Sequence, residues 1–181
     1  MNEGLIPNRY AKALYDYAIE QKAAGSVYDE ANRLASVYEA ESGLAKAVCN
    51  PFLSVDDKCK LLLTASASES GGCLDKFFRL VLDHGREAFM REIVLAYGRK
   101  YREANGILQV VITTAAVLSD AAMEKIKASV QACFVGKKLE YRTVVDADLI
   151  GGFTVKVDSQ LLDASMSNEL RKLRLKLLSK K

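Results

Sequence analysis

Apolar and polar positions follow two different periods along the chain, and the period changes near Asn105-Gly106. Before that point apolar residues recur every three to four positions, as in amphipathic helices that bury one face. After it, several short runs alternate singly between apolar and polar residues, which is typical of half-buried strands. The sequence therefore predicts an α+β chain, with an N-terminal six-helix bundle over residues 1–105 and a small C-terminal α/β module over residues 106–181.

The first three helices are bounded by proline and glycine signals. Pro7 suits the first turn of a helix, and we expect this first helix to end near Gly25. A second helical pattern closes at Ser42-Gly43. A short third helix spans residues 44–48 and ends before Asn50-Pro51, because the residue before a proline avoids the helical region.

The next three helices have clearer ends. Ser54 and the acidic residues after it have the form of a capping box that opens a helix over residues 58–67. A strongly apolar fifth helix ends at Gly85, which is in the usual position for a C-terminal cap. The sixth helix, residues 87–104, carries basic residues in its last turns, and these complement the helix dipole.

The second module reads as a strand, a helix, three strands and a terminal helix. The β-branched run 107–114 is the first strand, and Ser119-Asp120 caps a helix that continues to about Phe134. The later elements are a strand over residues 139–145, a strand over 153–157, a tight turn at Ser159-Gln160, a short returning strand over 161–163 and an amphipathic helix from Ser165 onward.

Composition agrees with a folded protein. Half of the 181 residues are hydrophobic, so a buried core can form, and a net charge of +3 does not indicate a nucleic-acid partner. No run approaches the ~18 to 20 apolar residues of a membrane-spanning helix, and the N-terminus lacks signal-peptide and transit-peptide patterns. The four cysteines lack metal-ligand spacing, which favours reduced thiols in a cytosolic chain.

No set of residues indicates catalysis, and we expect neither a cofactor nor a metal. The P-loop motif is missing, and the single histidine, His84, stands beside a capping glycine, where a capping or surface role is favoured over a catalytic triad. Gly71-Gly72 and Gly151-Gly152 are expected to serve turns or close packing. A carboxylate cluster is the alternative to turn formation for four aspartates of the second module, which are Asp146, Asp148, Asp158 and Asp163.

The terminal helix is the clearest candidate for a binding element. Its leucines recur at helical spacing, and its basic residues fall on the other side. Clustered Lys and Arg can neutralise phosphates, but no aromatic residue is interleaved for base stacking. A solvated basic face is the favoured interpretation, followed by binding to an acidic partner helix. A nucleic-acid- or ribosome-associated protein is the alternative function.

Four segments together resemble the δ subunit of F-type ATP synthase, which is called the oligomycin-sensitivity-conferring protein in mitochondria. They are NRYAKALYDYA, LDHGRE, YREANGILQVVITTA and DADLIGGFTVKVDSQLLDASMSNELRKL. Each is weak alone, but the combination is specific and covers nearly the whole chain. The resemblance implies a non-catalytic stator subunit that needs no cofactor and resists rotor torque during proton-driven ATP synthesis.

The resemblance also implies the partners. The N-terminal domain would hold the α-subunit N-termini at the top of the α/β hexamer, and the C-terminal domain would hold the end of the b-subunit stalk. It implies membrane association through partners only and no direct contact with nucleotide or nucleic acid. The missing targeting pattern favours a peripheral position on the cytoplasmic face of a bacterial inner membrane, with a processed organellar protein as the alternative.

In the family the α-subunit groove lies between the first and fifth helices. Leu14 and Phe77 fit the domain core better than the groove, whereas both roles stay open for Tyr10, Ala13 and Tyr17. The implied groove residues are Tyr10, Ala13, Leu14, Tyr17, Phe77, Leu80 and Val81. The stalk-binding candidates on the terminal helix are Leu170, Leu173, Arg174 and Leu177.

Overall fold

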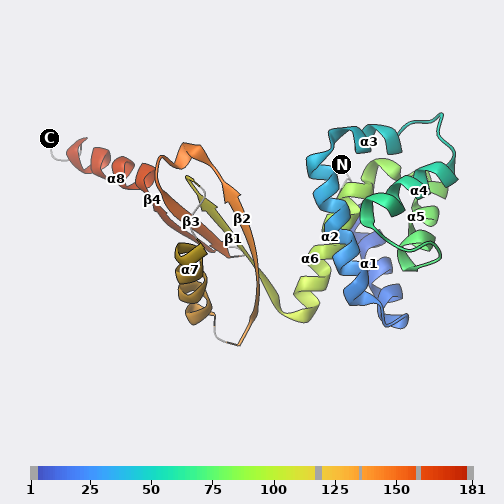
Figure 1. Cartoon of the computed structure of the whole chain (residues 1–181), viewed down its shortest axis with the longest axis horizontal. Coiled ribbons are helices and arrows are strands. Elements are labelled where there is room, and N and C mark those ends of the chain that lie inside the picture. The colour runs from blue at the N-terminus through green and yellow to red at the C-terminus, as the bar shows by residue number, and fades with distance from the viewer. Residues whose placement is uncertain (1–3, 117–119, 135, 158–159, 179–181) are drawn as a thin grey trace. The chain divides into compact units, whose positions relative to one another are not determined.

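The computed structural model describes residues 4–116, 120–134, 136–157 and 160–178 (Figure 1). The chain divides into two compact units, Met1–Ala104 and Asn105–Lys181, and each has its own hydrophobic core. The described residues contain eight α-helices and one four-stranded sheet, which confirms the expected α+β class. None of the helices in this described part is both long and apolar enough to cross a membrane.

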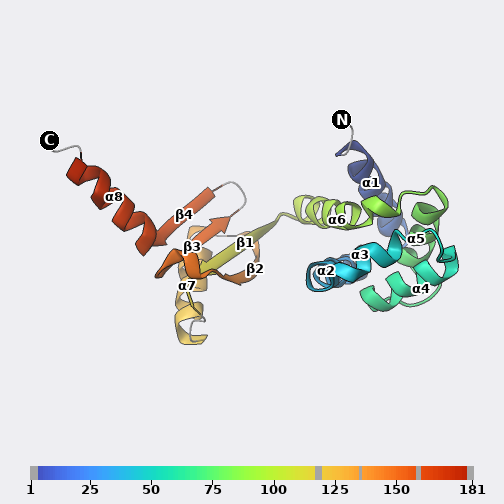
Figure 2. The same ribbon diagram turned by 90° about the horizontal axis from the view of Figure 1, so that it is seen from above.

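The first unit is built from helices packed around one core. Tyr97, Phe78, Leu14 and Leu34 are among its largest fully buried side chains. Two views at right angles show the helices gathered around that core (Figures 1 and 2). The elements are α1 (Leu5–Glu20), α2 (Ala24–Ala40), α3 (Ser42–Val48), α4 (Val55–Ser66), α5 (Cys73–Asp83), the one-turn 3-10 helix η1 (Glu87–Phe89) and α6 (Met90–Asn105).

The first helix ends earlier than the sequence predicts. α1 stops at Glu20, because Lys22 adopts a left-handed conformation with φ of 54°. The amide of Lys22 donates to the carbonyl of Ile19 and that of Ala23 to Ala18, which is the hydrogen-bond pattern of a Schellman cap. The expectation of an end near Gly25 was wrong because the cap contains no glycine.

The second helix boundary was also misplaced. α2 ends at Ala40, and the chain turns at Glu41, which has extended dihedral angles, so that Ser42-Gly43 already belongs to α3. Two other caps are confirmed. The Ser54 hydroxyl accepts a hydrogen bond from the amide of Asp57 at 3.1 Å, and Gly85 takes the left-handed conformation after α5 with φ of 61°.

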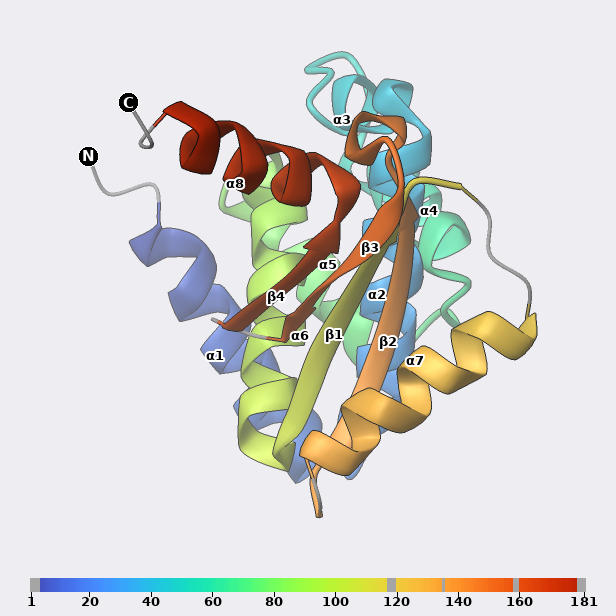
Figure 3. The ribbon, with the colours of Figure 1, turned by 90° about the vertical axis from the view of Figure 1, so that its left-hand side faces the viewer.

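The second unit is a four-stranded sheet with strand order β2-β1-β3-β4 (Figure 3). β1 and β2 are parallel, and the other neighbours are antiparallel. α7 packs against one face of the sheet through residues such as Ile126 and Val130 (Figure 2). The elements are β1 (Ile107–Thr114), α7 (Asp120–Cys133), β2 (Lys138–Val145), the 3-10 helix η2 (Ala147–Leu149), β3 (Gly152–Val157), β4 (Gln160–Ser165) and α8 (Met166–Leu178).

This order of strands and helices confirms the prediction for the second unit. Ser119 of the predicted helix cap, Ser159 of the predicted turn and Asp158 lie outside the described residues. Gln160 belongs to β4 instead of the turn. Gly152 has φ of 79°, and a Cβ atom there would collide with the carbonyl oxygen of Ala164 on β4, so the expected close-packing role is confirmed for this glycine.

Candidate functional site

The polar residues that could suggest catalysis have structural roles. The Nδ1 atom of His84 lies 2.6 Å from the carbonyl oxygen of Leu80, at the C-terminal cap of α5. Asp146 accepts a hydrogen bond from the amide of Asp148 at 3.0 Å. Asp163 accepts from the hydroxyl and the amide of Ser165, and these hydrogen bonds lower the pKa of Asp163. Among the described residues, no group of three or more His, Cys, Asp or Glu side chains could hold a metal ion.

The first candidate surface lies along one flank of α1 and the facing flank of α5, and we call it the α1/α5 surface. The Tyr10 ring meets the rings of Phe77 and His84 edge-on, each with a centroid separation of 6.4 Å. Leu80, on the same flank of α5, is 47% exposed. The surface consists of Tyr10, Ala13 and Tyr17 from α1 and Phe77, Leu80 and His84 from α5.

Helical periodicity explains why these residues share one side. α1 buries Ala11, Leu14 and Ala18, so its core-facing side is fixed. Tyr17 follows Tyr10 by seven residues and lies on nearly the same side of the helix, two turns further along. Both tyrosines are half-buried, and Ala13 is exposed. A tyrosine in this position can combine apolar contact with a hydrogen bond through its hydroxyl group.

Three of the predicted groove residues are buried. Leu14 and Phe77 are 1% and 7% exposed, which favours the core interpretation for both, and the Phe77 ring contacts the ring of Tyr10. Val81 is fully buried in the same core cluster, which favours a core role for this residue. Its position in the period of α5 places it on the side that faces the interior of the unit.

The second candidate surface is the terminal helix α8. Leu170 and Leu177 are 53% and 70% exposed, and Arg174 is exposed as well. Leu173 lies in α8, but its side chain falls outside the described part of the chain. The Ser165 hydroxyl caps this helix by accepting from the amide of Asn168 at 3.2 Å. Among the described side chains of α8, four large apolar ones are thus exposed on an element that is otherwise rich in Lys and Arg, namely Met166, Leu170, Leu175 and Leu177.

Sequence reasoning did not identify a third feature, an apolar groove of about 410 Å³ between α7 and the strands β3 and β4. Its floor is formed by Phe153, Val155 and Val157, which alternate along β3 and therefore point to the same face of the sheet. Ile126 and Val130 of α7 form one wall. The alternation of β3 predicted a buried face, but no local signal shows that α7 covers only part of it.

Comparison with known proteins agrees with a single family over the full length. The family model described as ATP synthase delta (OSCP) subunit matches residues 6–177. ATP synthase subunit delta of Parabacteroides distasonis is 34% identical over 178 residues, covering 98% of both chains. The protein of the same description from Phocaeicola vulgatus is 33% identical, covering 98% of this chain and 96% of its own.

A solved structure has the same fold. A chain of the Toxoplasma gondii mitochondrial ATP synthase hexamer superposes with a TM-score of 0.73 at 19% identity, covering 95% of this chain and 97% of its own. The family model and the bacterial relatives leave the nucleic-acid alternative without support. The chain belongs to the ATP synthase delta (OSCP) subunit family, and it is therefore a non-catalytic structural subunit of the ATP synthase stator.

Proposed function

We propose that this subunit joins the catalytic hexamer to the peripheral stalk through two separate surfaces. The α1/α5 surface binds the N-terminal helix of an α subunit, at the top of the α/β hexamer. α8 binds the C-terminal end of the b subunits. The observation that carries the proposal is the exposed apolar flank of α5 at Leu80, which faces aromatic side chains of α1 and fits the apolar face of a partner helix.

The proposed clamp must stay bound while the rotor turns. A complex that survives torque through many turnovers needs an affinity of at least nanomolar class, roughly 12 kcal/mol. A few buried anchors can supply most of such a binding free energy. Tyr10, Tyr17 and Leu80 are suitable anchors, because each combines a large side chain with partial exposure in the free protein.

The α-subunit contact can be tested at Ala13, which is exposed and small enough to let a partner backbone approach. We expect Ala13→Trp to weaken binding of a synthetic peptide of the α-subunit N-terminus without unfolding the first unit. Lys12→Trp is the matched control, because Lys12 is also exposed on α1 but points away from α5. Equal affinity of Ala13→Trp and wild type by calorimetry would remove Ala13 from the contact.

The stalk contact can be tested on α8 with substitutions of exposed residues. We expect the double variant Leu170→Asp and Leu177→Asp, or deletion of residues 170–178, to release the b subunits while α binding stays intact. Leu161→Asp is the control, since Leu161 is 64% exposed on β4. If the control releases the b subunits as completely as the double variant does, α8 is not the specific site.

The whole proposal can be tested by capture of the tagged chain from detergent-solubilised membranes of its source. Recovery of the α, β and b subunits with one copy of this chain per complex is the expected result. The proposal includes a peripheral position at the cytoplasmic face of a bacterial inner membrane, reached through these partners. Recovery of ribosomal proteins or nucleic acid in place of these subunits would contradict it.

A further inference from the structure

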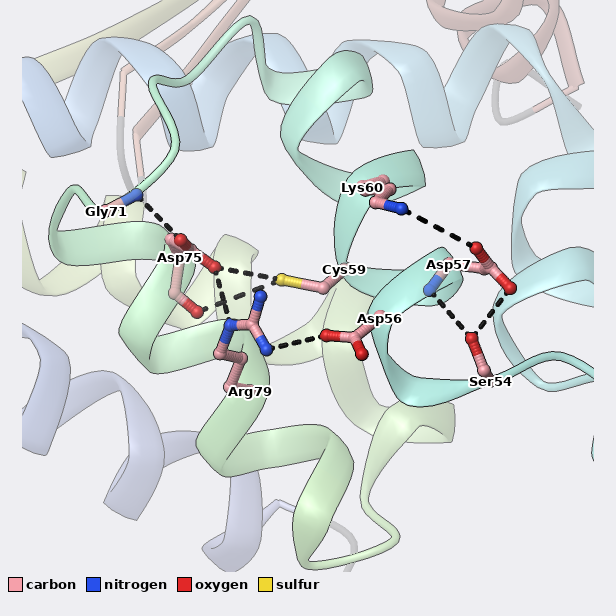
Figure 4. A network of polar contacts seen from close by, with 8 residues as sticks. All are labelled: Ser54, Asp56, Asp57, Cys59, Lys60, Gly71, Asp75 and Arg79. Carbon is pink, nitrogen blue, oxygen red and sulfur yellow. Dashed lines mark hydrogen bonds and ion pairs between the residues drawn. The ribbon is translucent and has the colours of Figure 1, made fainter.

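A polar network joins α4 to α5 through residues outside the two proposed binding surfaces (Figure 4). Cys59, which is 1% exposed on α4, donates its thiol proton to Oδ1 of Asp75 on α5 at 3.1 Å. The same carboxylate accepts from the amide of Gly71 at 2.7 Å and from Nε of Arg79 at 3.1 Å. Arg79 also donates a hydrogen bond from Nη1 to Oδ1 of Asp56, at the start of α4, at 2.8 Å.

This network fixes the protonation states of its members. The hydrogen bond from the Gly71 amide and that from the Cys59 thiol, together with Arg79, lower the pKa of Asp75 below its ordinary value, so this buried carboxylate is charged. Burial, followed by the hydrogen bond to Asp75, raises the pKa of Cys59 to about 12, so the thiol remains a proton donor at neutral pH. Separating α4 from α5 would remove the Cys59 donor from this charged carboxylate and break the Arg79–Asp56 ion pair, which is costly for the buried contact.

The network and the α1/α5 surface occupy opposite flanks of α5. Asp75 and Arg79 lie one turn apart and contact α4 (Figure 4). Phe77 and His84 contact Tyr10 of α1 instead. α5 is therefore held on the α4 side by charged hydrogen bonds and carries a partly exposed apolar flank on the α1 side. Movement of α5 toward α1 would bury more of that apolar surface and is favoured by the hydrophobic effect.

We propose that the Cys59–Asp75–Arg79 network is a latch that positions α5 and keeps the α1/α5 surface open for its partner. The three side chains act as positioning residues, because they join α4 to α5 on the flank of α5 opposite the α1/α5 surface. A surface that is already open loses less conformational entropy when the partner helix binds, so the latch raises the affinity for that helix. The identity of the bound helix in this inference rests on the proposed function, whereas the claim that the network keeps the surface open does not.

His84 gives a direct readout of the position of α5. It is the single histidine of the chain, so its ring gives one Cε1–Hε1 cross-peak in a carbon–proton NMR spectrum, and that ring lies against Tyr10. We expect Asp75→Asn and Cys59→Ala in the full chain to shift this cross-peak well below the unfolding temperature. Cys59→Ser retains a donor and should restore the wild-type position. Arg79→Gln, at a half-exposed position, provides the test if Asp75→Asn does not fold.

Ser54→Ala is the matched control. It removes the N-terminal cap of the same helix α4 and so destabilises the unit, but the hydrogen bonds of the Ser54 side chain go to Asp57 of α4 and not to α5 (Figure 4). We expect the His84 cross-peak of Ser54→Ala to stay at its wild-type position. If the network only adds stability, the His84 cross-peak will stay at its wild-type position in the latch variants as it does in Ser54→Ala. That result would overturn the inference.

The second readout is the affinity for the synthetic α-subunit N-terminal peptide. We expect Asp75→Asn to weaken binding roughly tenfold, with Ser54→Ala unchanged. Wild-type affinity in Asp75→Asn together with an unmoved His84 cross-peak would disprove the latch. If the wild-type chain does not bind the peptide, the proposed partner is wrong, and the His84 cross-peak alone decides whether the network positions α5.

Discussion

Leu80→Ala is the sharpest test of the α1/α5 surface, because its magnitude follows from the structure. Complete burial of a leucine side chain contributes about 1.5–3 kcal/mol. Leu80 is 47% exposed in the free protein, so a docked helix can bury only about half of that side chain. The substitution should therefore reduce the binding free energy by roughly 0.7–1.5 kcal/mol, which weakens Kd roughly three- to twelvefold.

The assay is calorimetric titration of the full-length variant with the α-subunit N-terminal peptide. Ile19→Ala is the matched control, because Ile19 is 50% exposed on α1 but lies on the flank away from α5. Both substitutions remove a similar exposed apolar area, and only Leu80→Ala should change Kd. An unchanged Kd for Leu80→Ala, or an equal loss for Ile19→Ala, would refute the assignment of the surface.

Three further predictions concern stability and reactivity. Gly152→Ala should lower the free energy of unfolding of the second unit by about 3 kcal/mol or more in thermal unfolding, whereas Gly136→Ala, at a similar φ but with open space around it, should cost only about 1–2 kcal/mol. Iodoacetamide at pH 8 should modify the exposed cysteines and spare Cys59 until denaturant is added, as mass spectrometry can show. Because the pKa of Asp75 is lowered on folding, its contribution to stability is present above pH 3.8 and is lost as the pH falls further. Acidification should therefore lower the free energy of unfolding of Asp75→Asn by less than that of the wild-type chain.

Local chemistry was sufficient to predict much of the fold. The β-branched run 107–114 is β1 with unchanged ends, because no competing helical period overlaps it. The caps at Ser54 and Gly85 were predicted from residue types whose hydrogen bonding and backbone freedom decide the conformation locally. Elements with such local determinants can be read from a sequence without knowledge of what packs around them.

Other helix ends depend on residues that give no such signal. Lys22 and Ala67 both adopt left-handed conformations after α1 and α4, at positions where glycine is the usual residue. A non-glycine residue in this region costs about 1–2 kcal/mol, and tertiary packing of the following helix must offset that cost. The end of α1 is therefore determined by contacts between helices and could not be derived from the residues at the turn, whereas α4 ends at Ser66, one residue before the predicted end.

The same distinction limits what can be predicted about α5. Its period shows a wide apolar arc, but the period cannot tell which residues of the arc face the core and which face a partner. Val81 and Leu80 are adjacent in sequence, yet one is fully buried and the other half-exposed, because successive side chains of a helix point about 100° apart and that of Val81 faces the core. In the proposed latch, the exposure of Leu80 also depends on the contacts that Asp75 and Arg79 make with α4 on the far side of the same helix. The latch proposal therefore predicts that substitutions outside the α1/α5 surface change how it binds, which the helical period of α5 alone does not predict.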